Sequence, residues 1–180
     1  ERRSVRQYLA DAVRSAGGDR EYAWAVAAIA ALSFALAAAS FYSTYAVREL
    51  GAGTRDVARF TAITLGASVV GMPLLGRIAD RRGHKLSLEI TATCFAVAAV
   101  LALFAGSVES IYAVTLLSGI GMSGVSVSQN LLLSEFAPTH ADVPMYIVFS
   151  WLVLAPFRTG APIVAGLVSD LASFHAMFWI

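Results

Sequence analysis

The chain has 180 residues, of which 58% are hydrophobic and 14% are charged, and its mean hydropathy is +0.70. Soluble domains are about half apolar and about a quarter charged, so the shortage of charge excludes an ordinary water-facing surface and predicts a membrane protein. The net charge of +1 offers no basic field for nucleic acid. The single cysteine, Cys94, stands inside an apolar run, so no disulfide framework or metal cluster is available.

Residues 1–22 form a polar segment in which five arginines are interleaved with apolar residues. The apolar residues between positions 5 and 13 fall on one helical face, which predicts a short amphipathic basic helix that ends at Gly17 and Gly18. We expect this segment to be a cytoplasmic linker that lies on the anionic inner leaflet. A helix that binds a protein partner is the alternative.

Five apolar segments are long enough to cross a hydrocarbon core of about 30 Å at about 1.5 Å per residue. We expect spans at about 23–47, 57–79, 86–105, 111–136 and 143–167, and the beginning of a sixth span at 174–180. The predicted fold is therefore all-α, a polytopic transmembrane helical bundle over residues 23–180. Since the sequence starts without methionine and stops inside an apolar run, we expect it to be a fragment.

The first span is rich in alanine until hydroxyl and aromatic side chains gather near its far end. Ser40 and Thr44 are four residues apart and lie on one helical face. They either line a polar cavity or belong, with Tyr45, to an aromatic belt at the membrane interface.

The fourth span is the most polar, and its second half contains Ser126, Gln129 and Asn130. Two pairs have the small-x-x-x-small spacing that predicts close helix packing, Gly119 with Ser123 and Gly124 with Ser128. An unpaired amide in hydrocarbon costs several kcal/mol, so Gln129 and Asn130 are expected to face protein or a water-filled cavity. Hydrogen bonding between helices and contact with a substrate are alternative roles for them.

The fifth span contains an arginine among helix-breaking residues. Pro156, Gly160 and Pro162 surround Arg158, and we expect them to kink or break the helix. Arg158 lies within about one helical turn past the midpoint of the span. An intramembrane arginine must pair, face water or extend to the interface, so Arg158 either belongs to a transport pathway or reaches outward toward Asp170.

A charged loop, Gly76-Arg77-Ile78-Ala79-Asp80-Arg81-Arg82-Gly83-His84-Lys85, separates the second and third spans. Its spacing, G-x-x-x-D-R-x-G-x-K, resembles the signature loop of the major facilitator superfamily of membrane transporters. Carried over by position, the motif residues are Gly76, Asp80, Arg81, Gly83 and Lys85, and His84 stands where arginine or lysine is more usual. Glu89, about one turn into the third span, is placed to pair with Arg77, Arg81 or Lys85.

With this loop inside the cell, the expected inner segments carry nine arginines and lysines and the outer segments carry three, as the positive-inside rule requires. We therefore expect a protein of the cytoplasmic membrane, with residues 1–22 and 80–85 on the cytoplasmic side and the lipid bilayer as its surroundings.

The resemblance implies the second six-helix half of a secondary transporter, whose other half belongs to the same longer chain and which moves a small solute by alternating access. It also implies that the first and fourth spans line the central cavity, which favours Ser40, Thr44, Ser126, Gln129 and Asn130 as the substrate pathway. Arg158 of the fifth span joins this set as an intramembrane arginine. In the same family picture Asp80 stabilises a helix N-terminus or pairs with an arginine of the other half.

No acid–base, nucleophile or metal constellation is visible within the spans, so neither an enzyme nor a bound cofactor or metal is expected. A non-transporting membrane sensor or assembly subunit is the alternative to a transporter. Proton coupling is left open, because Glu89 and Glu135 lie near the inner face and no carboxylate lies deep in a span. Proton coupling through the other half of the transporter and transport without proton coupling are both consistent with the sequence.

Overall fold

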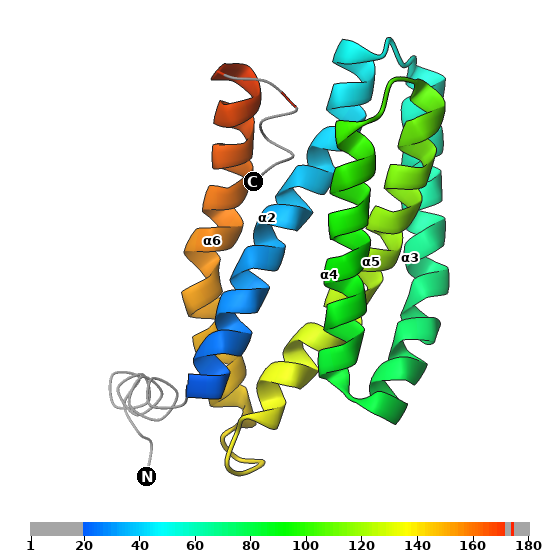
Figure 1. Cartoon of the computed structure of the whole chain (residues 1–180). Coiled ribbons are helices and arrows are strands. Elements are labelled where there is room, and N and C mark those ends of the chain that lie inside the picture. Colours follow the sequence, from blue (N-terminus) through cyan, green and yellow to red (C-terminus); the bar gives the residue numbers. More distant parts are fainter. Residues whose placement is uncertain (1–19, 172–173, 175–180) are drawn as a thin grey trace.

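The structure is a computed structural model that describes residues 20–171 and 174. The described part contains five helices: α2 (Arg20–Glu49), α3 (Thr54–Arg82), α4 (His84–Leu103), α5 (Val108–Glu135) and α6 (Val143–Leu171). They run up and down side by side (Figure 1), and each is long and apolar enough to cross a membrane. The all-α prediction is confirmed. The proposed basic helix before residue 20 and nearly all of the expected sixth span lie outside the described residues.

Four of the five helices are longer than the apolar runs that predicted them, whereas α4 has the expected length and begins two residues earlier. The helix α2 begins at Arg20, inside the segment that we expected to be linker. Only Gly83 separates α3 from α4. Its φ of 92° is accessible to glycine at little cost, and its N–H donates to the Ala79 carbonyl oxygen at 2.8 Å. The signature loop is therefore two helix ends joined by a single glycine.

The helix α6 continues through Pro156 and Pro162, so of the two expected outcomes the break is wrong, and the kink stays a prediction. Each proline lacks an N–H and removes one hydrogen bond within the helix. A complete break would expose several backbone groups to hydrocarbon, where water cannot satisfy them. The loss of two separate hydrogen bonds costs less than that, and the helix stays continuous.

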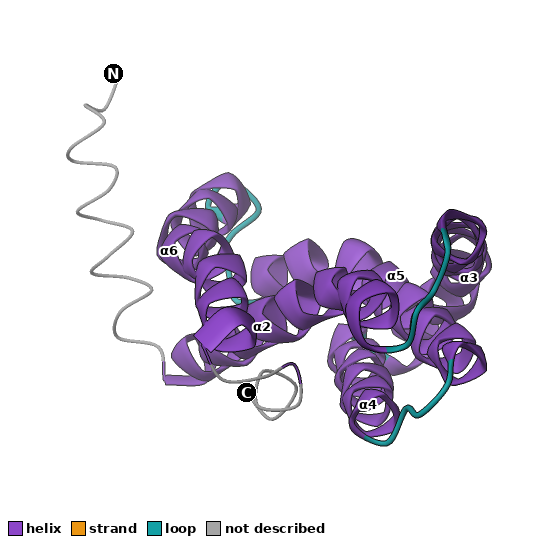
Figure 2. Ribbon diagram, turned by 90° about the horizontal axis from the view of Figure 1, so that it is seen from above, coloured by secondary structure: helices purple, strands orange, loops and turns teal. Residues whose placement is uncertain are grey.

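The helix α5 packs closely on α3 and α4, and these three helices form one group, with α2 and α6 as a second (Figure 2). Glycines of α5 make this approach possible. A Cβ atom at Gly119 would overlap the Thr64 carbonyl oxygen of α3, and one at Gly121 would lie 2.9 Å from the Phe95 ring of α4. At Gly124 it would overlap Thr91. The close packing predicted from the small-residue spacing is confirmed.

The helices α2 and α6 are held together at their N-terminal ends by aromatic packing. The Tyr22 ring meets the Tyr146 ring edge to face, with 5.2 Å between centroids, and its hydroxyl lies 2.6 Å from the Ser150 Oγ atom. The C-terminal part of α5 leans across to these two helices (Figure 1), and Phe136 adds a second edge contact to Tyr22 at 5.8 Å. This lean brings polar residues of α5 next to α2 and α6.

Candidate functional site

A groove of about 600 Å³ lies between α2, α5 and α6. We call it the polar groove. Its polar lining comes from all three helices and consists of Ser33, Ser40, Ser126, Gln129, Asn130 and Arg158. Trp151 and five apolar residues complete it, Leu36, Ala37, Met122, Val125 and Pro162. Five of the six residues that the sequence analysis assigned to a pathway therefore meet in one place. Thr44 is half-buried on α2 and does not line the groove.

Arg158 is the only charged side chain that lines the polar groove in the described part of the chain. Its Nη2 atom donates to the Oε1 atom of Gln129 at 2.8 Å. Its guanidinium carbon lies 4.1 Å from the centre of the Trp151 ring, a cation–π contact that is stronger where water is scarce. Trp151 precedes Arg158 by about two helical turns, so the side chain extends toward the N-terminal half of α6 and away from Asp170. In this conformation Arg158 does not extend outward toward Asp170, which was the alternative that the sequence left open.

The amides of α5 are oriented by the same network. Gln129 is buried, with 4% of its surface exposed, and its carbonyl oxygen accepts the hydrogen bond from Arg158. The Asn130 Oδ1 atom accepts a hydrogen bond from the Trp151 Nε1 atom at 3.2 Å. Both amides thus hydrogen-bond between helices, while the NH₂ group of the exposed Asn130 has no partner among the described residues.

The rest of the groove supplies oxygen atoms. Ser40 and Ser126 donate their hydroxyl protons to carbonyl oxygens of their own helices, at 3.4 Å and 2.9 Å. Their lone pairs stay able to accept a hydrogen bond. Pro162 cannot donate to the Arg158 carbonyl oxygen four residues earlier, so this backbone acceptor also lacks its usual helical partner.

Trp151 is the functional candidate that sequence reasoning missed. An aromatic residue in a membrane helix is ordinary, and nothing in its own neighbourhood marks it. Its spacing from Arg158 is the available signal, because residues seven apart share a helical face.

The signature residues lie at the ends of α3 and α4, away from the polar groove. Gly76, Asp80 and Arg81 are in α3, and Asp80 and Arg81 are exposed without an ion pair to a described residue. Lys85 pairs with Glu89 at 3.9 Å, which confirms one of the three partners expected for Glu89. Both side chains are mostly exposed, so this ion pair contributes little to stability.

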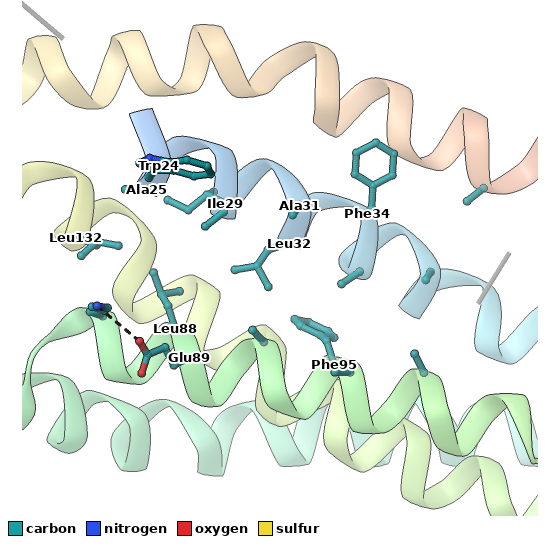
Figure 3. Close-up of a pocket in the computed structure, with 18 of the residues that line it drawn as sticks. Trp24, Ala25, Ile29, Ala31, Leu32, Phe34, Leu88, Glu89, Phe95 and Leu132 are labelled. Carbon is teal, nitrogen blue, oxygen red and sulfur yellow. Dashed lines mark ion pairs between the residues drawn. The ribbon is translucent and has the colours of Figure 1, made fainter. Parts of the chain in front are cut away.

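A second groove, of about 1000 Å³, lies between α2, α4 and α5 and is mostly apolar (Figure 3). Trp24, Ile29, Leu88 and Phe95 point toward it. The ion pair of Glu89 with Lys85 also lines it. None of the residues assigned to the pathway lines it. Within the described residues, no three histidine, cysteine, aspartate or glutamate side chains are grouped so that they could hold a metal ion.

A family model described as "Sugar (and other) transporter" matches residues 13–180. The chain belongs to this transporter family of the major facilitator superfamily. The resemblance seen in the signature loop is thereby confirmed, and so is the partial transmembrane bundle expected from it. The family comprises membrane transporters and not enzymes.

Curated relatives are matched over part of their length. Myo-inositol transporter 2 of Cryptococcus neoformans is 29% identical over 112 residues, which are 57% of this chain and 20% of that protein. The metabolite transport protein YyaJ of Bacillus subtilis is 28% identical over 93 residues, which are 52% and 21%. The multidrug resistance protein MdtG of Proteus mirabilis is 27% identical over 126 residues, which are 66% and 29%. The match thus spans less than a third of each relative. No solved structure matches significantly.

Proposed function

We propose that this chain is part of the C-terminal half of a secondary active transporter, which moves a small solute across the cytoplasmic membrane by alternating access. The observation that carries the proposal is the polar groove. Six polar residues from three membrane helices meet there, although polar groups inside a bilayer are costly and mark solute or ion pathways. The groove is open on one side, which suits a site completed by the other half of the transporter.

The signature residues suit the moving boundary between the two halves. Gly83 joins α3 and α4 with a single residue, so the two helices would move together. Asp80 and Arg81 are exposed beside it and would be available to residues of the other half. In the proposed orientation this end, with residues 80–85, and the segment 1–22 are cytoplasmic.

Membership of the family does not identify the solute or the ion to which transport is coupled. The names of the three relatives point to myo-inositol, to metabolite transport and to multidrug resistance, which share no single chemistry. No carboxylate lines the polar groove in the described part of the chain. A proton gradient could act through a carboxylate of the other half, and transport without proton coupling fits the groove equally well.

Cysteine accessibility tests whether the groove holds water. Cys94 and any cysteine of the other half are first replaced in the full-length protein. Single cysteines are then placed in the groove, by Ser126→Cys and Asn130→Cys, and on the outer surface of α4, by Val100→Cys as the matched control. Val100 is 51% exposed and lines neither groove.

A charged methanethiosulfonate reagent reacts with thiolates, which form in water and not in lipid. In membrane vesicles we expect Ser126→Cys and Asn130→Cys to be labelled and Val100→Cys to stay unlabelled. A transporter further requires that transported solutes slow the labelling. If the groove cysteines react no faster than the control, the groove is sealed, and the chain belongs instead to a membrane sensor or an assembly subunit.

A further inference from the structure

We propose that the polar groove binds a small organic acid that carries one carboxylate and hydroxyl groups, with the carboxylate on Arg158. This inference rests on the proposed transport function and adds a substrate class to it. It starts from the charge of the groove. Arg158 is its only charged lining residue in the part of the chain described, and no described carboxylate lies within ion-pair distance of its guanidinium.

The partners of Arg158 are neutral. Gln129 accepts one hydrogen bond, and the Trp151 ring covers one face of the guanidinium. Neither cancels the positive charge, and an uncompensated charge within a membrane protein is costly. A bound anion would cancel it. One guanidinium matches one carboxylate, whereas a phosphate dianion would leave a negative charge over.

The geometry leaves the binding edge of Arg158 available. The N–H groups of a guanidinium lie in its plane, so stacking on Trp151 takes none of them. One of the five donors is used by Gln129. The others are able to form the paired, parallel hydrogen bonds that arginine makes with a carboxylate. Because Asn130 uses its oxygen for Trp151, its NH₂ group adds a further donor in the same groove.

The remaining polar atoms suit hydroxyl groups on the body of the acid. Ser40 and Ser126 have donated their protons to their own helices, so they offer lone pairs. Ligand hydroxyls would donate to these acceptors while the carboxylate accepts from Arg158 and Asn130.

The test compares acids with alcohols of the same skeleton, in which CH₂OH replaces the carboxylate. Three pairs are used, gluconate with sorbitol, lactate with 1,2-propanediol, and benzoate with benzyl alcohol, the last being a pair without other hydroxyls. Equilibrium binding of radiolabelled compounds is measured on purified full-length protein, as wild type and as Arg158→Gln. Arg55→Gln is the matched control, since it removes the same charge from an exposed position in the first turn of α3.

We expect a hydroxylated acid to bind at least tenfold more tightly than its alcohol, with the preference lost in Arg158→Gln and kept in Arg55→Gln. Arg158→Lys should keep part of it, because lysine retains the charge and loses the planar pair of donors. Equal binding of acid and alcohol, a preference that survives Arg158→Gln, or binding of none of the three acids would overturn the inference. If Arg158 forms an ion pair with a carboxylate of the other half, acid and alcohol should bind equally.

The two proposals fail differently. If the groove cysteines are labelled in water and a neutral solute is transported while acids are ignored, the transport proposal stands and the anion inference is wrong. If acids bind at Arg158 but no solute crosses the membrane, the anion site stands, and the chain is a sensor of organic acids.

Discussion

Gly119 is the position where the packing of α5 on α3 makes the sharpest prediction. A Cβ atom there would overlap the Thr64 carbonyl oxygen and would lie 2.7 Å from the Ala67 Cβ atom. Carbon atoms in contact prefer about 3.5–4.0 Å, so Gly119→Ala has to push the two helices apart by about 1 Å. The obstacle includes backbone, which cannot rotate away as a flexible side chain would. Overpacking of this kind costs about 1–3 kcal/mol.

Gly66→Ala is the matched control for this change. Gly66 lies in α3, is exposed, and a Cβ atom there would meet nothing within 4 Å. Alanine favours a helix over glycine by about 1 kcal/mol, and this gain is common to both variants. The difference between the two variants therefore isolates the cost of overpacking.

The assay is thermal unfolding of the full-length protein in one detergent, followed as loss of the monodisperse peak. Because membrane proteins often unfold irreversibly, the variants are compared at one heating rate. At about 2–4 °C per kcal/mol, Gly119→Ala should unfold about 2–12 °C below Gly66→Ala. Equal midpoints for the two variants would mean that α3 and α5 are not in the contact described, and the packing argument would be refuted.

Three further changes probe other contacts. Trp151→Leu removes the aromatic surface under the guanidinium, a contact worth about 0.5–2 kcal/mol, and should weaken solute binding about 2- to 30-fold. The affinity of Trp151→Phe should lie between those of Trp151→Leu and wild type. Equal affinities of all three would exclude the cation–π contact. Tyr112→Phe removes the hydrogen bond to Asp56 at 3.1 Å and should lower stability by about 1 kcal/mol in the same thermal assay, whereas an unchanged midpoint would contradict this. Lys85→Ala should change the midpoint by less than the scatter of the assay, because its ion pair with Glu89 is exposed.

The helices were predictable because the bilayer constrains them strongly. A span needs about 20 apolar residues, which the hydropathy of the sequence detects. Its backbone groups must also form hydrogen bonds within the segment, which a helix provides. The ends were less predictable. Arg20 and Arg82 are polar, yet both belong to helices, since a helix can continue past the hydrocarbon where hydropathy no longer reports on it.

The polar groove was partly predictable for a related reason. Amides and arginine are rare in membrane helices and rarely face lipid, so Gln129 and Arg158 were candidates on residue type alone. Their hydrogen bond joins residues 29 positions apart on different helices, and no local pattern encodes it. Thr44 has the same chemistry as Ser40 but lies outside the groove, because a face shared on one helix does not determine how far along it a cavity reaches. The roles of the groove residues in transport stay a prediction.

Solute uptake into proteoliposomes tests the central claim, that the polar groove lies on a transport pathway, most directly. The full-length protein is reconstituted as wild type, Arg158→Ala and Gln129→Ala, with Arg55→Ala as the control, and the initial uptake of a panel of solutes is measured with and without a pH gradient. The account predicts that both groove variants fold, with an unchanged monodisperse peak, and lose transport, while the control keeps it. Wild-type rates in Arg158→Ala and Gln129→Ala would contradict the account and would reduce the network around Arg158 to helix packing.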